Sequence, residues 1–262
     1  MGDYPLSYND FSIILPVISS ELNSRESQLT DAVNSVLRQS YPRWELIIID
    51  DCSSDNVPTI ADEFAKKDPR IKVIHHQQQG QRAKSRNDGM KLATNPWICW
   101  LDSDDEYLKT YLEVLNSYMT EDYPGYMCYN YGAIVVRMGY QSLRNPQELR
   151  ENGEGMESFA SGSTGCGSFC FNKSVLDTVG YLPETMNPHR FADMCKEETP
   201  QIKEMFGGKY LEGGKDLGNP WGDDYYMFWK ITRKFKSKVL PIAPYIQFVR
   251  RQRFSFQPKR DY

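Results

Sequence analysis

The chain has 262 residues and a formal net charge of −4, with 31 basic and 35 acidic residues. This length fits one large α/β domain and is enough to bury a substantial core without disulfides or structural metals. The slightly acidic balance argues against a protein that binds nucleic acid through bulk electrostatics, because such proteins carry a basic excess.

Membrane insertion and metal-stabilised folds are also not expected. No apolar run is long enough to cross a bilayer, and the start of the chain lacks the basic region and cleavage site of a signal peptide. The six cysteines form no Cys-x-x-Cys pair and there are only three histidines, which makes a zinc site improbable. We therefore interpret the cysteines as reduced residues of a cytoplasmic protein.

The first hundred residues alternate short apolar runs with helical patterns. Four strands are predicted, at residues 11–18, 44–50, 71–74 and 97–101. Helical spacing of apolar residues predicts helices between them. Such an alternation indicates a mostly parallel, Rossmann-like α/β sheet with helices on both faces. Ligands of these sheets bind outside the carboxyl ends of the strands.

After residue 120 the pattern is less regular. Residues 126–136 are predicted to form one strand or two, and 137–162 a mobile loop. A short strand is expected at 166–171, followed by a short helix capped by Ser174. Beyond it we expect, in order, an insertion at 184–220, an aromatic helix at 223–235, a late strand at 238–242 and a basic tail from Arg250.

The segment Asp102-Ser103-Asp104 directly follows the fourth predicted strand. Carboxylates two residues apart in an extended segment project to one side. Oxygen ligands of this kind suit Mg²⁺ or Mn²⁺, which bind through one or two carboxylates together with substrate phosphates. The alternative is a solvated acidic turn, but the position after an apolar strand favours a metal site.

Three other polar segments carry a functional and a structural interpretation. Asp50-Asp51 ends the second strand, where it could recognise a base or ribose or could simply form a turn. Charges at the start of the helix from Gly80 could face a diphosphate, although for Arg82 and Lys84 we favour a solvated surface. Asp223-Asp224 could supply a general base or cap a helix, and taken alone the cap is favoured.

Five motifs occur in an order that resembles family 2 glycosyltransferases of the GT-A fold. They are Pro16 after the first strand, Ser35-Val-Leu-Arg-Gln-Ser-Tyr-Pro42, Glu45-Leu-Ile-Ile-Ile-Asp-Asp-Cys-Ser-Ser-Asp55, Ser85-Arg-Asn-Asp-Gly89 and Leu101-Asp-Ser-Asp-Asp105. The similarity is dense from about residue 11 to 120 and continues loosely to about 255. It implies a single GT-A domain over 1–262, with a nucleotide-sugar half at 1–120 and an acceptor half at 121–262.

The resemblance also implies roles for individual residues. The family's base-recognising aspartate falls on Asp51, and its metal-binding aspartate on Asp104. Further nucleotide-sugar contacts are expected at Pro16, Val17, Arg86, Asn87, Asp102 and Ser103. The family's catalytic pair falls on Asp223 and Asp224, which makes Asp224 the expected base. Asp223 and Trp221 are expected to contact the acceptor, although core packing explains Trp221 equally well.

The chain departs from the family pattern at three places. The residues after Pro16 are Val17-Ile-Ser19, where the family often has a tyrosine that stacks on the base, and the following loop is longer. Near the C-terminus, Gln252 stands where the family often has a histidine. Asp223 replaces the usual glutamate, which shortens that side chain by one methylene.

With these residues, the resemblance implies a metal-dependent, inverting glycosyltransferase that uses Mn²⁺ or Mg²⁺. The expected donor is a nucleoside diphosphate-sugar, with UDP-sugar favoured, and the expected acceptor is a saccharide or lipid-linked hydroxyl in polysaccharide or glycoconjugate synthesis. For the basic tail from Arg250, a solvated segment is favoured over peripheral contact with a membrane that bears a lipid-linked acceptor. Two alternatives are a nucleotidyltransferase of related fold, disfavoured because the loop after Pro16 has no glycine, and a non-catalytic nucleotide-sugar-binding protein.

Overall fold

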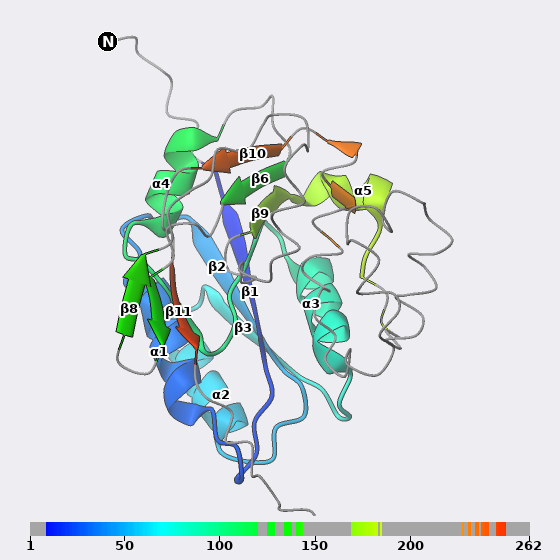
Figure 1. Ribbon diagram of the computed structural model, residues 1–262. Coiled ribbons are helices and arrows are strands. Elements are labelled where there is room, and N and C mark those ends of the chain that lie inside the picture. The colour runs from blue at the N-terminus through cyan, green and yellow to red at the C-terminus, as the bar shows by residue number, and fades with distance from the viewer. Residues whose placement is uncertain are drawn as a thin grey trace, which may run out of the picture.

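The computed structural model describes most of the first 119 residues and parts of the rest (Figure 1). The described residues are 9–119, 125–128, 134–137, 140–143, 169–182, 184, 227, 230–231, 234–235, 237–240 and 245–249. Among the described residues, no helix combines the length and apolar character needed to span a bilayer.

The first part of the chain alternates strands and helices as its sequence predicts. The strands are β1 (Phe11–Val17), β2 (Trp44–Asp50), β3 (Ile71–His75), β4 (Trp97–Trp100) and β5 (Asp105–Tyr107). The helices are α1 (Glu26–Leu37), α2 (Val57–Lys67), α3 (Gln81–Leu92) and α4 (Tyr111–Tyr118). Later elements are β6 (Gly125–Cys128), β7 (Ile134–Arg137), β8 (Tyr140–Leu143), β9 (Phe169–Asn172), a 3₁₀ turn (Lys173–Val175), α5 (Leu176–Val179), β10 (Ser237–Leu240) and β11 (Tyr245–Val249).

The strands form two sheets. The larger has seven strands in the order β10-β6-β9-β4-β1-β2-β3, and the smaller has four in the order β5-β11-β7-β8. In the larger sheet β1 pairs in parallel with both β2 and β4, and β2 pairs in parallel with β3. Strand β9 runs antiparallel to both of its neighbours. The prediction of a mostly parallel sheet is therefore confirmed.

Alternate residues of β1 face opposite sides of the sheet, as the period of a strand requires. Ile13 and Leu15 belong to the hydrophobic core between the sheet and helices α1 and α2. Leu29 and Val33 of α1 are part of the same core. Ile14 points to the other side, where its side chain lies against Gly89 of α3. Helix α3 lies on the opposite face of the sheet from α1 and α2 (Figure 1). Helices on both faces explain why β1 and β2 are almost continuously apolar and buried.

Glu45 joins the end of α3 to the sheet. Its carboxylate accepts hydrogen bonds from the Thr94 backbone N–H at 2.6 Å and from Lys72 Nζ at 2.6 Å. Burial alone would raise the pKa of Glu45, but bonds from Lys72, Ser12 and Thr94 outweigh it and lower the pKa. The charged form is therefore favoured inside the fold.

Several predicted elements need correction. The loop expected at 137–162 contains a strand, β8. The cap expected at Ser174 is formed instead by Asn172, whose side chain accepts a hydrogen bond from the Ser174 backbone N–H. Strands β5 and β11 were not predicted. The expectation of one strand or two at 126–136, in contrast, is confirmed, since this segment contains two strands, β6 and β7.

The close approach of α3 to the sheet depends on Gly89. A Cβ at this position would lie 2.5 Å from Ile14 Cγ2 and 2.9 Å from Ile49 Cδ1. We expect Gly89→Ala to lower the free energy of unfolding by about 1–3 kcal/mol, since overpacking outweighs the ~1 kcal/mol by which alanine favours a helix. Urea unfolding measures this change. Leu92→Ala, at an exposed position of the same helix, is the control, and a stabilised Gly89→Ala variant would refute the packing argument.

Candidate functional site

The carboxyl ends of β1, β2 and β4 meet at one edge of the sheet. Val17 lies opposite Asp50 in the parallel register, and the Asp51 backbone N–H donates to Val17 O at 2.8 Å. The Leu101 N–H donates to Ile14 O at 3.0 Å on the other side of β1. The two acidic segments, Asp50-Asp51 and Asp102-Ser-Asp-Asp105, are therefore brought to the same edge, as predicted.

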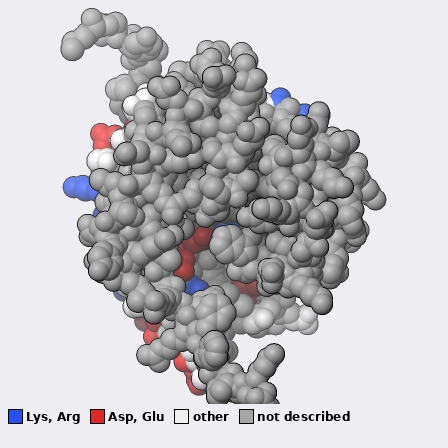
Figure 2. Space-filling model, in the orientation of Figure 1, with Lys and Arg blue, Asp and Glu red and all other residues white. Residues whose placement is uncertain are grey.

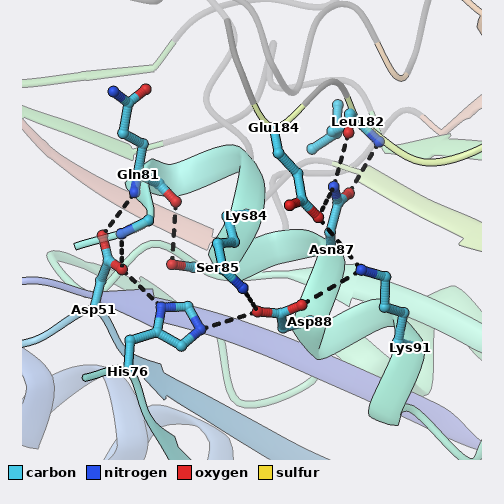
Figure 3. Close-up of polar contacts among 11 residues, drawn as sticks. Asp51, His76, Gln81, Lys84, Ser85, Asn87, Asp88, Lys91, Leu182 and Glu184 are labelled. Atoms are coloured by element: carbon cyan, nitrogen blue, oxygen red, sulfur yellow. Dashed lines mark hydrogen bonds and ion pairs between the residues drawn. The ribbon is translucent and has the colours of Figure 1, made fainter. Parts of the chain in front are cut away.

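The Asp51 carboxylate is buried against the start of α3 (Figure 3). Its Oδ1 accepts hydrogen bonds from the Gly80 backbone N–H at 2.7 Å and from His76 Nδ1 at 2.7 Å. Its Oδ2 accepts from the Gln81 backbone N–H at 3.0 Å. An ionised carboxylate can accept about four hydrogen bonds. Asp51 thus ties β2 to α3, and the described residues leave it about one acceptor position.

His76 lies between two carboxylates (Figure 3). Its Nε2 is 3.0 Å from Asp88 Oδ2, on the opposite side from Asp51. Asp88 also accepts from Lys84 Nζ at 2.5 Å, and its pKa is lowered because Lys84, Lys91 and His76 outweigh the effect of burial. With a carboxylate on each side, each ring nitrogen of His76 faces a hydrogen-bond acceptor, and His76 thereby connects Asp51 to Asp88.

Backbone strain is concentrated beside Asp51. Within the described part of the chain, the non-glycine residues with positive φ are Cys52, at 64°, and Gln81, at 66°. This left-handed region costs an ordinary residue roughly 1–2 kcal/mol, and such strain clusters at functional sites. The two residues flank the Asp51 carboxylate, one in sequence and one through its N–H. The strain therefore marks this edge as a candidate functional site.

A second histidine pairs with the neighbouring aspartate. His75 Nδ1 lies 2.9 Å from Asp50 Oδ2, and its Nε2 lies 3.2 Å from Asp62 Oδ1. Burial disfavours the charged ring, but the hydrogen bonds and charges of Asp50 and Asp62 outweigh burial. They raise the pKa of His75 above its ordinary value of 6.5.

This raised pKa predicts how stability depends on pH. Protonated His75 stabilises the fold fully below pH 6.5, and this contribution is lost as the pH rises through the higher folded pKa. The difference in unfolding free energy between the wild type and His75→Gln should therefore shrink as pH rises. Urea unfolding from about pH 5 to about pH 9 measures it. A difference that stays constant across that range would show that His75 does not contribute in this way.

Asp102 is held by a buried arginine. Arg86, on α3, has a fully buried side chain, and its Nη2 donates to Asp102 Oδ1 at 3.2 Å. The guanidinium carbon lies 4.6 Å from the ring centroid of Trp100, close enough for a cation–π contact. Asp102 itself remains partly exposed. Arg86 and Asp102, which were predicted separately as nucleotide-sugar contacts, are therefore connected, and Arg86 orients Asp102.

Asp104, the expected metal residue, pairs with an arginine that was not among the predicted site residues. Arg25 Nη1 lies 2.7 Å from Asp104 Oδ2, and the side chains are 29% and 34% exposed. Ser103 is buried between the two aspartates. In the described residues, no three His, Cys, Asp or Glu side chains are grouped to hold a metal ion. Asp104 and Asp102 alone still fit Mg²⁺ or Mn²⁺, which take one or two carboxylates plus substrate phosphates and water.

Four of the aspartates at this edge have a cationic or titratable partner. The pairs are Asp50–His75, Asp51–His76, Asp102–Arg86 and Asp104–Arg25. Figure 2 shows acidic and basic residues together in a hollow near the centre of the face in view. An edge with this charge pattern can accept a ligand that carries both hydrogen-bond donors and negative charge.

Asn87 has a different environment from the rest of the predicted site. Its side-chain amide donates to Leu182 O at 2.7 Å and accepts from the Leu182 N–H at 2.9 Å (Figure 3). Its buried amide therefore fixes the segment after α5 to α3. This geometry gives Asn87 a structural role, and contact with a nucleotide stays a prediction.

The remaining predicted residues divide into two groups. Pro16 and Val17 lie at the end of β1, in register with Ile49 and Asp50, at the same edge as the aspartates. Trp221, Asp223, Asp224 and Gln252 lie outside the described residues, as do the basic tail and the insertion beyond Glu184. The acceptor side and the catalytic base therefore stay predictions.

Sequence reasoning missed His75, His76 and Arg25. The histidines follow the third predicted strand, and a parallel partner of β2 must carry its last residues next to Asp50-Asp51. The positions of His75 and His76 beside Asp50-Asp51 could therefore have been predicted from the parallel register of the third strand on the second. Arg25 gave no comparable signal, because its contact with Asp104 spans 79 positions in the chain.

The chain is similar to known proteins over the region that carries its sequence motifs. Residues 12–179, more than half of the chain, match the model of the family described as Glycosyl transferase family 2. The chain is 36% identical over 152 residues to the UDP-Glc:alpha-D-GlcNAc-diphosphoundecaprenol beta-1,3-glucosyltransferase WfgD of Escherichia coli. That match covers 58% of this chain and 55% of WfgD. The chain spans about half the length of the curated relatives it matches first.

Solved structures share the fold at low sequence identity. S. aureus TarS 1–349 in complex with UDP-GlcNAc superposes with a TM-score of 0.61 at 18% identity, covering 92% of this chain and 59% of TarS. The mannosyltransferase PcManGT of Pyrobaculum calidifontis, in complex with GDP-Man and Mn2+, gives a TM-score of 0.57 at 12% identity, covering 95% of this chain and 60% of its own. The fold is thus that of the GT-A transferases. With the match to the family model, it follows that the chain belongs to glycosyl transferase family 2.

Proposed function

We propose that this protein is a metal-dependent, inverting glycosyltransferase that moves a sugar from a nucleoside diphosphate-sugar to an acceptor hydroxyl. The observation that carries the proposal is the convergence of Asp50-Asp51 and Asp102-Ser103-Asp104 at the carboxyl edge of a parallel sheet. Parallel α/β sheets bind their ligands at this edge. Membership of family 2 supports the reaction type.

Asp104 is the proposed metal residue, with Asp102 nearer to the ribose and Ser103 beside both. A Mn²⁺ or Mg²⁺ ion bound there would neutralise negative charge on the diphosphate leaving group. Arg86 holds Asp102 in place through its hydrogen bond, so that carboxylate is already oriented before a donor binds. The Mn2+ in the structure of the related mannosyltransferase supports the choice of a divalent ion.

Asp51 is the proposed contact for the base of the donor. Among the described residues, the hydrogen bonds from His76, Gly80 and Gln81 leave about one acceptor position on its carboxylate. Uracil presents a single N–H donor at N3, whereas guanine presents N–H groups at both N1 and N2. A carboxylate with one position left therefore suits uracil better. The UDP-GlcNAc bound to TarS and the UDP-Glc in the name of WfgD support a UDP-sugar donor.

Asp224 is the proposed base for the acceptor hydroxyl, with Asp223 and Trp221 beside it on the acceptor side. In an inverting reaction, the deprotonated hydroxyl attacks the anomeric carbon from the face opposite the diphosphate. Asp224 takes the proton, and the bond from the sugar to the diphosphate breaks. The alpha-D-GlcNAc-diphosphoundecaprenol in the name of WfgD supports a saccharide or lipid-linked acceptor.

The direct test is release of nucleoside diphosphate from a panel of nucleotide-sugars in the presence of Mn²⁺ or Mg²⁺. We expect release from a UDP-sugar, and Asp104→Ala should lower the rate by at least about a hundredfold because charge on the leaving group is no longer neutralised. Glu106→Gln, which removes a nearby carboxylate that pairs with Arg38, is the matched control and should retain activity.

Three outcomes would contradict parts of this proposal. If no donor in the panel is cleaved or bound, the protein is not a glycosyltransferase. Full metal-dependent activity of Asp104→Ala would refute the metal assignment. A near-normal rate of transfer by Asp224→Asn would mean that the base lies elsewhere.

A further inference from the structure

Arg25 is held at the candidate site by the loop between β1 and α1. The Ser19 backbone N–H donates to Ser53 Oγ at 3.0 Å, and Ser19 Oγ donates to Asp55 Oδ2 at 2.5 Å. The Arg25 backbone N–H in turn donates to Ser19 Oγ at 2.7 Å. Arg25 also starts α1, since its carbonyl accepts the N–H of Leu29 at 2.8 Å. The backbone of Arg25 is therefore fixed whatever its side chain contacts.

The side chain of Arg25 is far less constrained than its backbone. Its described polar contact is the 2.7 Å ion pair with Asp104, and both partners are about one-third exposed, at 29% and 34%. Exposed ion pairs of this kind contribute only about 0–1 kcal/mol. Arg86, in contrast, is completely buried and stacks on Trp100 while it holds Asp102. Asp102 is thus paired with a buried arginine, whereas Asp104 is paired with a partly exposed one.

A cation at Asp104 has a direct consequence for metal binding. A divalent ion that binds Asp104 must displace Arg25 or tolerate a like charge next to it, and repulsion at this distance weakens binding. A displaced guanidinium stays near Asp104 because its backbone is anchored. It presents planar N–H donors that suit phosphate oxygens, and the proposed metal site places the donor diphosphate there.

We propose that Arg25 exchanges partners during donor binding, from the Asp104 carboxylate in the empty enzyme to the diphosphate of the donor in the loaded one. This inference rests on the proposed function. It makes Arg25 a further diphosphate-binding residue. The exchange also couples binding of the metal ion to binding of the donor diphosphate. The metal ion displaces Arg25 from Asp104, and Arg25 then binds the diphosphate.

Binding measurements on the intact chain test the exchange without relying on turnover. Mn²⁺ alone, UDP with saturating Mn²⁺, and uridine are titrated into the wild type, Arg25→Gln and Arg25→Lys by calorimetry. For Arg25→Gln, Mn²⁺ alone should bind about threefold to tenfold more tightly, because no cation competes for Asp104. UDP should bind about tenfold more weakly, since a charge-assisted bond to phosphate is lost. Uridine should bind as to the wild type, and Arg25→Lys should recover part of the UDP affinity.

Arg38→Gln is the matched control, because it removes another arginine from the opposite end of α1 and breaks a surface pair with Glu106. It should change none of the three affinities. If Arg25→Gln binds Mn²⁺ no more tightly than the wild type, or loses no more UDP affinity than Arg38→Gln, the exchange is refuted. Equal losses for uridine and UDP would refute it too, since they indicate a general structural defect. A wild type that binds neither Mn²⁺ nor UDP would instead refute the proposed function itself.

Discussion

The parallel pairing of β1 with β2 on one side and β4 on the other is the constraint on which the site depends. Because the three strands point the same way, the residues that follow them must leave the sheet at one edge. The two acidic segments are over 50 positions apart in sequence, yet the hydrogen bonds of Asp51 to Val17 and of Leu101 to Ile14 fix both to β1. Gly89 adds to this constraint, because it lets α3 approach close enough for its first residues to bind Asp51.

Several aspartates lie close together at this edge, and four of them are paired with a histidine or an arginine. The inner aspartates, Asp50 and Asp51, are paired with the histidines at the end of β3. The outer aspartates, Asp102 and Asp104, are paired with arginines of unequal freedom. Burial decreases from Asp51 to Asp104, so the pair that is easiest to separate is also the one beside the proposed metal and diphosphate. This decrease in burial suits a rigid site for the base at Asp51 and a more mobile site for the diphosphate at Asp104, as proposed above.

The sequence predicted the strands that carry this edge well, since apolar runs such as Trp44–Asp50 are buried on both faces and bounded by polar turns. It also predicted that Asp51, Arg86, Asp102 and Asp104 belong to one site, because their positions follow from strand ends and from the order of family motifs. The partners of these residues were harder to predict. His76 contacts Asp51 through the register of β3 on β2, and Arg25 contacts Asp104 through a loop whose path no local pattern specifies. The two hydrogen bonds between Asn87 and the Leu182 backbone were likewise not predicted, because they join α3 to a segment 95 positions later in the chain.

The central claim is that the donor binds along this edge with its base near Asp51 and its diphosphate near Asp104. Amide hydrogen exchange of the wild type, with and without UDP and Mn²⁺ together, tests it most directly. We expect new protection in the segments after β1, at the start of α3 and in the turn from Asp102 to Asp105, and little change on the far side of the sheet. UDP-dependent protection confined to other segments, with none at these three, would contradict it.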